Sequence, residues 1–233
     1  MCGRYALYGP MSRLREAMLL DECPEYGERY NIAPQASILV VRYKPGTGRV
    51  GQMARWGLVP AWAKDPAIGA RLNNARGETV AEKPAFRSSF ARHRCLIPAN
   101  GFYEWQAVDT DGHARKQPWY IHPSEPGGFF AFAGLLALWK APDGSAIIST
   151  CIITTGPNEL MADIHERMPV ILRPEHFAAW LDPTNQDVAA LTLLLQPLAA
   201  ERMSAYPVSP SINSGRAEGP KCIVPLRLNL PRA

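Results

Sequence analysis

The feature that most constrains the fold is a series of short strand-like runs, separated from one another by Gly, Pro and Asp. The runs occupy residues 37–43, 50–56, 94–97, 119–122, 129–139 and 146–155. Their β-branched and aromatic side chains favour extended backbone, and the turn formers between them end each run. Since few helix-length segments lie between the runs, we expect a largely antiparallel β-sheet core that is barrel-like or nearly closed.

Four shorter segments have the features of helices and should lie at the periphery of the sheets. Ser12 can cap a helix whose apolar residues lie at 11, 14 and 18 and which ends before Pro24. Residues 157–165, 174–181 and 186–195 each have a proline at or near one end. The fold class that follows is α+β. At 233 residues, we expect a single domain over 1–233.

The composition is that of a globular protein, with 47% hydrophobic and 20% charged residues. The longest nearly apolar stretch, residues 129–139, is far shorter than the roughly 18–20 residues that cross a bilayer. No basic segment followed by an apolar one opens the chain. We therefore expect a cytoplasmic protein without membrane contacts.

The five cysteines are scattered, and no C-x-x-C pair is present. This spacing argues against a structural zinc site and against a disulfide framework. We expect no bound metal.

The basic residues are concentrated in one part of the chain, although the net charge is only +4. Such a patch is typical of nucleic-acid-binding proteins, and the arginine fork suits phosphate groups. A genome rich in G and C would also enrich arginine, so charge alone leaves both explanations open. The residues of this stretch are Arg71, Arg76, Lys83, Arg87, Arg92 and Arg94, against Glu78 and Glu82.

Cys2 is a candidate nucleophile because removal of Met1 would leave an α-amine and a thiol on the same residue. An α-amine with a pKa near 7.7–8.0 forms imines with aldehydes, and the adjacent thiol can then close a five-membered thiazolidine. The second step is intramolecular and benefits from a high effective molarity. The alternative is that position 2 is small only to permit removal of the initiator methionine.

Four polar residues lie in stretches that otherwise have the character of a core. Asn74 and Arg76 are two apart and should face the same way on an extended chain. Glu104 lies among aromatic residues, where desolvation would raise its pKa. His165 ends a predicted helix, before an apolar strand, and should titrate near neutrality. Alternatively, Asn74 stabilises a turn, Glu104 pairs with an arginine and His165 only satisfies a helix end.

Together, these residues lie in motifs that resemble the SOS-response-associated peptidase family, whose eukaryotic members are the 5-hydroxymethylcytosine-binding proteins of embryonic stem cells. The resemblance covers essentially the whole chain, including Y-P-V-S and S-I-N-S near its end. The motifs are M-C-G-R-Y (1–5), R-Y-N-I-A-P (29–34), W-G-L-V-P-A-W (56–62), N-A-R-G-E-T (74–79), R-C-L-I-P-A-N-G-F-Y-E-W (94–105) and D-I-H-E-R-M-P (163–169).

The resemblance implies a sensor and shield of abasic sites in single-stranded DNA that forms a covalent thiazolidine crosslink through Cys2. By family similarity, Asn74 orients the N-terminal residue, Glu104 shuttles protons, and His165 assists ring opening and crosslink reversal. Self-cleavage of the bond before Cys2 is a second implied activity, and no cofactor is implied. We expect the protein to be a monomer that associates with the nucleoid when it acts on DNA. The residues that match the family's DNA contacts are Arg4, Pro34, Trp62, Arg76, Arg87, Trp105 and Thr154.

Two other function classes remain open at the level of sequence. An N-terminal-nucleophile amidase or cysteine peptidase would use Cys2 against an amide with His165 as the base. A non-covalent reader of modified or single-stranded DNA would need the basic and aromatic residues but not Cys2. Substitution of Cys2 distinguishes the three possibilities. A crosslinking protein should lose its DNA adduct, an amidase or peptidase should lose peptide turnover, and a non-covalent reader should be unchanged.

Overall fold

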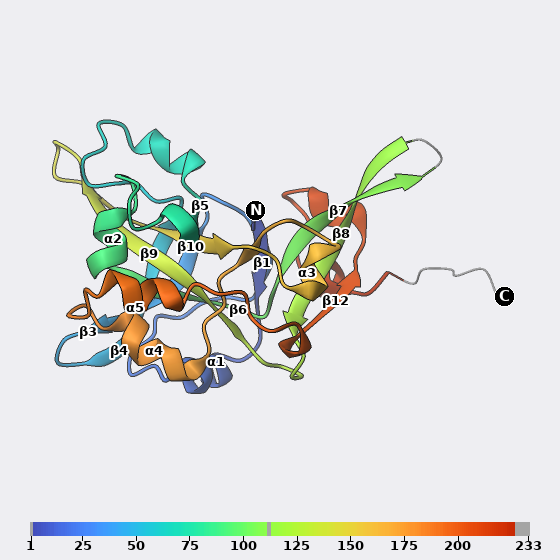
Figure 1. Ribbon diagram of the computed structural model, residues 1–233, viewed down its shortest axis with the longest axis horizontal. Helices are drawn as coiled ribbons and strands as arrows, with labels where there is room; N and C mark the ends of the chain where they lie inside the picture. The colour runs from blue at the N-terminus through green and yellow to red at the C-terminus, as the bar shows by residue number, and fades with distance from the viewer. Residues whose placement is uncertain (1, 111–112, 227–233) are drawn as a thin grey trace.

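The computed structural model describes residues 2–110 and 113–226 (Figure 1). Its strands are β1 (Arg4–Leu7), β2 (Arg29–Ile32), β3 (Ser37–Lys44), β4 (Gly48–Trp56), β5 (Asn74–Arg76), β6 (Arg94–Ala99), β7 (Gly101–Thr110), β8 (His113–Pro123), β9 (Phe130–Lys140), β10 (Ala146–Thr155), β11 (Met168–Pro169) and β12 (Met203–Pro207). Its α-helices are α1 (Met11–Met18), α2 (Arg87–Arg92), α3 (Glu159–Ala162), α4 (Phe177–Leu181) and α5 (Val188–Leu193).

Five strands form a closed barrel. Their order is β10-β4-β3-β6-β9, and β9 pairs with β10 to close the ring. All of these pairs are antiparallel except β4 with β10, which is parallel. The short strands β5 and β11 also pair with β10. The expected α+β class with a largely antiparallel, barrel-like core is confirmed.

A second sheet lies beside the barrel and contains β12-β8-β7-β1-β2, all antiparallel. In Figure 1 the barrel and most helices occupy one side, the β7–β8 hairpin projects from the other, and β1 lies between them. The N-terminal segment therefore enters the molecule where the two sheets meet.

The alternating side chains of β1 connect the two halves of the core. Tyr5 and Leu7 pack into the main apolar cluster with the barrel residues, whereas Ala6 points into a second cluster with Tyr103 and Tyr120. This is the period-two alternation of an extended strand that is buried on both faces. Cys2, just before the strand, is fully buried in the main cluster.

The helices are shorter than the sequence predicts, and one helix start is different. Helix α1 begins at Met11 after Pro10 without a side-chain cap, so the assignment of Ser12 as the cap was wrong. Because Pro10 is the N-cap residue, Ser12 lies inside the first turn, where its hydroxyl does not act as a cap. Helix α3 is capped by Asn158, whose side chain accepts the N–H of Met161. Within the described residues, we find no helix long and apolar enough to cross a membrane.

Candidate active site

Cys2 lies at the centre of a group of polar residues where the two sheets meet. Its side chain is fully buried, and this burial raises the pKa of the thiol well above its usual range. The negative charge of Glu104 acts in the same direction. The thiol is therefore uncharged at neutral pH, and any attack by sulfur requires a neighbouring base to take its proton.

Asn74 holds the backbone of Cys2 in place. Its Nδ2 donates a 2.9 Å hydrogen bond to the carbonyl oxygen of Cys2. Asn74 is the first residue of β5, whose parallel pairing with β10 fixes its position. Its Oδ1 is buried and, among the described residues, accepts no hydrogen bond. That oxygen is thus available to an amine at the N-terminal residue.

Glu104 is the most strongly desolvated acid of the site. It lies on β7 between Tyr103 and Trp105, opposite Trp119, and only 2% of its surface is exposed. Burial raises the pKa of its carboxyl group to about 7. The direction is the one expected from its aromatic neighbours, and a carboxyl group with this pKa can both take and give a proton at neutral pH.

His165 faces Glu104, with 3.8 Å between its Nε2 and Oε2 of the carboxylate. Its Nδ1 accepts the backbone N–H of Arg167 at 3.0 Å, and the carbonyl oxygen of Arg167 lies 3.2 Å from the same nitrogen. The backbone of Arg167 can therefore either donate a hydrogen bond to Nδ1 or accept one from it. Desolvation lowers the pKa of His165 below its usual value, so the ring is mainly neutral at pH 7.

An ion pair between Arg167 and Glu78 holds the segment after His165 in place. This pair was not predicted from the sequence. The guanidinium of Arg167 makes two hydrogen bonds to the carboxylate of Glu78, at 2.6 and 3.0 Å, and a further one to the carbonyl of Thr154 at 2.8 Å. This fork geometry ties the His165 loop to β10 and to the turn after β5. Arg167 and Glu78 both lie in the recognised motifs, but their pairing across 89 residues has no local signal.

An open pocket of about 540 Å³ gives access to Glu104 and His165. Trp105, Lys116 and Asn213 complete its lining. The indole N–H of Trp105 donates to Oδ1 of Asn213 at 2.7 Å, which fixes the ring at the rim. Lys116 and Asn213 were not identified from the sequence, because each reaches the pocket from a different strand or turn.

The expected DNA contacts fall into two groups. Trp62 is 60% exposed and donates its indole N–H to the carbonyl of Pro84, near the exposed Arg87 at the start of α2. Arg76 is also exposed, whereas Pro34, after β2, is half-buried. These side chains, with Trp105, remain candidates for contact with DNA.

Arg4 and Thr154 make contacts within the protein. Nη1 of Arg4 donates to Oδ1 of Asn31 at 2.7 Å and to the carbonyl of Ile212 at 3.2 Å. Thr154 is fully buried, and its hydroxyl bonds to the carbonyl of Ala75. The Arg4 contacts stabilise the C-terminal segment that carries Asn213, and Thr154 supports β5.

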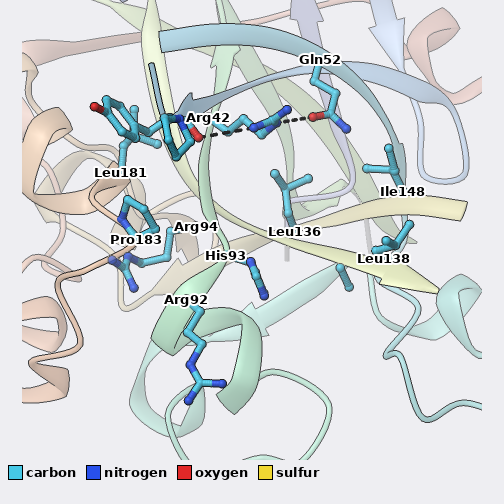
Figure 2. A pocket seen from close by; sticks show the side chains of 13 residues that line it. Arg42, Gln52, Arg92, His93, Arg94, Leu136, Leu138, Ile148, Leu181 and Pro183 are labelled. Carbon is cyan, nitrogen blue, oxygen red and sulfur yellow. Dashed lines mark hydrogen bonds between the residues drawn. The ribbon is translucent and has the colours of Figure 1, made fainter. Parts of the chain in front are cut away.

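The basic stretch 71–94 does not form a single surface. Arg94 is 4% exposed, and its guanidinium donates to five backbone carbonyls at the ends of α2 and α4. Arg92 lines a different pocket, together with His93 (Figure 2). Arg94 is therefore not available to a DNA-binding surface, because the chain turns from β5 through α2 into the barrel within this stretch.

Comparison with known proteins agrees with this architecture. The family model of the SOS response associated peptidase (SRAP) matches residues 1–215. The chain belongs to the SOS response associated peptidase family. An "Abasic site processing protein YoqW" of Bacillus subtilis (strain 168) is 44% identical over 226 residues, covering 96% of this chain and 99% of that protein.

More distant matches come from both sequence and structure. The "Abasic site processing protein HMCES" of Rattus norvegicus is 30% identical over 275 residues, covering 98% of this chain and 77% of that protein. A crystal structure of a phage-related protein from Bordetella bronchiseptica is 30% identical with a TM-score of 0.70, over 89% of this chain and 94% of that one. A protein from Bacteroides thetaiotaomicron matches the fold with a TM-score of 0.81 over 97% of this chain and 100% of that one, at 24% identity.

Proposed function

We propose that this protein processes abasic sites in DNA by forming a covalent bond to the lesion through Cys2. The names of its relatives from Bacillus subtilis and Rattus norvegicus support the substrate class. The grouping of Cys2, Asn74, Glu104 and His165 supports the chemistry, since it places a nucleophile beside two groups that can move protons.

The reaction begins after Met1, which lies outside the described residues, has been removed. The ring-opened abasic sugar presents an aldehyde, and the α-amine of Cys2 adds to it with loss of water to give an imine. The thiol then adds its sulfur to the imine carbon while its proton is transferred to nitrogen. The product is a thiazolidine, and no oxidant or reductant is needed.

Proton transfer is assigned to Glu104 and His165. Because the Cys2 thiol is held neutral by burial, its proton must leave as the sulfur attacks, and the Glu104 carboxylate is the neighbouring base. Neutral His165 can accept a proton during ring opening and return it during reversal. Asn74 orients the reacting residue through the Cys2 carbonyl.

The pocket favours single-stranded over double-stranded DNA. Trp62 and Trp105 offer ring faces on which unpaired bases can stack, and Arg76, Arg87 and Lys116 can neutralise phosphate groups. Stacking on these rings requires bases that are not paired with a complementary strand. The buried nucleophile also requires the damaged sugar to enter the pocket, which is easiest in an unpaired strand.

The observation that carries the proposal is the placement of Cys2 beside Glu104, and substitution of Cys2 tests it. The mature protein should form a gel-stable adduct with single-stranded DNA that contains one abasic site, and none with undamaged DNA. Cys2→Ala should lose the stable adduct while an imine that borohydride traps remains, because the α-amine is retained. Cys23→Ala is the matched control and should react normally. An undiminished stable adduct from Cys2→Ala would disprove the mechanism.

Removal of Met1 is included in the proposal as self-cleavage of the bond before Cys2, with Glu104 as the proton-transferring group. Intact mass spectrometry of protein made without an aminopeptidase tests this step. The parent protein should lose Met1, and Glu104→Gln should retain it. Equal loss from both proteins would assign the cleavage to another agent and leave the crosslinking proposal unaffected.

A further inference from the structure

A second pocket, of about 430 Å³, opens on the outside of the barrel (Figure 2). Strands β3, β4, β9 and β10 supply one part of its lining, and the junction of α2 with β6 and the residues after α4 supply the rest. It shares no lining residue with the pocket around Glu104. Ile148 in this pocket and Thr154 near the site are six positions apart on extended β10, a distance of about 20 Å at roughly 3.3 Å per residue.

The floor of this pocket is apolar and open to solvent. Leu138 and Ile148 are paired across β9 and β10, so they lie side by side, and they are 48% and 39% exposed. Tyr43 on β3 is 44% exposed, and Leu136 lies beneath them with 8% exposed. Single apolar side chains on a surface are ordinary, but several in one concave area mark a binding site.

The rim of the pocket is positively charged. Arg42 and Arg92 supply the charge beside the apolar floor, His93 also lines the pocket, and the lining contains no carboxylate. The guanidinium of Arg42 is held by hydrogen bonds to Oε1 of Gln52 and to the carbonyl of Tyr43, so it is already ordered. The carboxylate of nearby Asp182 instead accepts hydrogen bonds from Thr184.

His93 reports the local electrostatics. Its pKa is lowered by burial and by the charges of Arg92 and Arg94. A bound carboxylate would offset those charges and favour the protonated ring. His93 is therefore a probe of any acidic ligand in this pocket.

We propose that this pocket docks a short acidic segment of a partner protein, which inserts one bulky aliphatic or aromatic side chain onto the floor between Leu138 and Ile148. The ordered arginine fork and the lack of carboxylates favour Asp or Glu on either side of that anchor. The volume is in the range of sites that hold one large side chain with its neighbouring backbone. A nucleic acid would leave the aliphatic floor unfilled, since phosphates and sugars are polar and the lining offers only the rings of Tyr43 and His93 for stacking.

The separation from the crosslinking site gives the docking a clear consequence. A partner bound here leaves the pocket around Glu104 open, so the protein can hold a damaged strand and the partner at once. The docking site stands independently of the proposed crosslinking chemistry, and its test requires no abasic DNA.

The test uses two probes, a fluorescein-labelled peptide with a central leucine pair between runs of glutamate, and labelled oligo-dT. The acidic peptide should bind the full-length protein in fluorescence anisotropy. Leu138→Ser and Arg42→Glu should each weaken binding by about tenfold or more. Leu193→Ser and Arg202→Glu, which change exposed residues of the same kinds elsewhere, should bind as the parent does.

Further arms decide between this proposal and its alternatives. Replacing the peptide's leucines by serine, or its glutamates by lysine, should abolish binding. In NMR titrations, the pKa of His93 should rise with the acidic peptide and should not rise with either replaced peptide. No saturable binding of the acidic peptide, or equal binding by Leu138→Ser, would overturn the proposal. Displacement of the peptide by oligo-dT, with loss of oligo-dT binding in Arg42→Glu, would assign the surface to nucleic acid and overturn it as well.

Discussion

Glu104 is the residue whose environment differs most from that of a free side chain in water. Its carboxyl group is almost fully buried and has a pKa of about 7, against 4.5 for the free group. The folded state therefore binds this proton more tightly than the unfolded state does. The resulting stabilisation is fully present below pH 4.5 and is lost as the pH rises through 7.

We predict that Glu104→Gln becomes progressively more stable than the parent protein as the pH rises from 5 to 8. The uncharged amide avoids the cost of ionising a buried carboxyl, which reaches at most about 3 kcal/mol for this pKa difference. Urea unfolding at several pH values measures the effect. The exposed Glu82→Gln is the control, and a difference between Glu104→Gln and the parent that did not change with pH would contradict the assignment.

The Arg167–Glu78 pair acts on the site through His165. Arg167 presents both its N–H and its carbonyl to Nδ1 of the ring, and its side chain is held by Glu78 and by Thr154. The ring therefore keeps its orientation whether Nδ1 is protonated or not. A loosened Arg167 would let the ring turn away from Glu104.

Glu78→Gln should slow crosslink formation by about tenfold, because a small misplacement of an acid-base group is costly. The free energy of unfolding should change by less than about 1 kcal/mol, since the Glu78 carboxylate is half exposed. Time courses on abasic DNA measure the rate, and Glu82→Gln serves as the matched control. An unchanged rate would show that the pair does not position His165.

At the scale of elements, Arg94 joins two helices to the barrel. From the first position of β6 it donates to carbonyls of Phe90 and Ala91 at the end of α2, and to Trp180, Asp182 and Asn185 at and after the end of α4. Helix C-termini leave carbonyls without partners and carry partial negative charge. One guanidinium satisfies both ends at once.

Arg94→Leu should lower the free energy of unfolding by about 3 kcal/mol or more, because it leaves several buried carbonyls without donors. Chemical denaturation measures the loss. Arg92→Leu, two residues earlier and exposed, should change stability by less than about 0.5 kcal/mol. If both variants unfolded at the same denaturant concentration, the linking role of Arg94 would be wrong.

At the scale of the whole molecule, the site exists because two sheets meet at β1. Cys2 comes from the segment just before β1, Asn74 from the strand added to the barrel, Glu104 from the second sheet and His165 from the segment after α3. None of these elements contains more than one of the four residues. In the proposed function, the exposed residues around them form the entrance for a strand of DNA.

Binding of single-stranded DNA should weaken steeply with salt and should exceed binding of intact duplex. Arg76→Ala should reduce the slope of log affinity against log salt by about 0.7, the value for one lost phosphate contact on a single strand. Anisotropy titrations over a range of salt concentrations measure the slope, with Arg13→Ala as control. Equal affinity for duplex, or an unchanged slope, would count against this entrance as the DNA path.

Several features of the protein follow from the sequence by itself, because they depend on neighbouring residues. The strands at 37–43 and 146–155 occur with those bounds or within one residue of them, since runs of β-branched side chains favour extended backbone wherever they lie. The raised pKa of Glu104 follows from its aromatic neighbours along β7. The roles of the site residues and the single-domain organisation stay predictions.

Other features were decided only by the tertiary structure, because they join residues that are distant in sequence. Strands β1, β2, β5 and β12 have no clear local signal. Strands β1, β5 and β12 pair with the longer strands β7, β10 and β8, and β2 pairs with β1. The burial of Arg94, the Arg167–Glu78 pair and the contact of Asn213 with Trp105 each depend on a partner brought near by closure of the barrel or by docking of the C-terminal segment. Periodicity tells which face of an element is apolar, but only the packed molecule determines which polar groups meet.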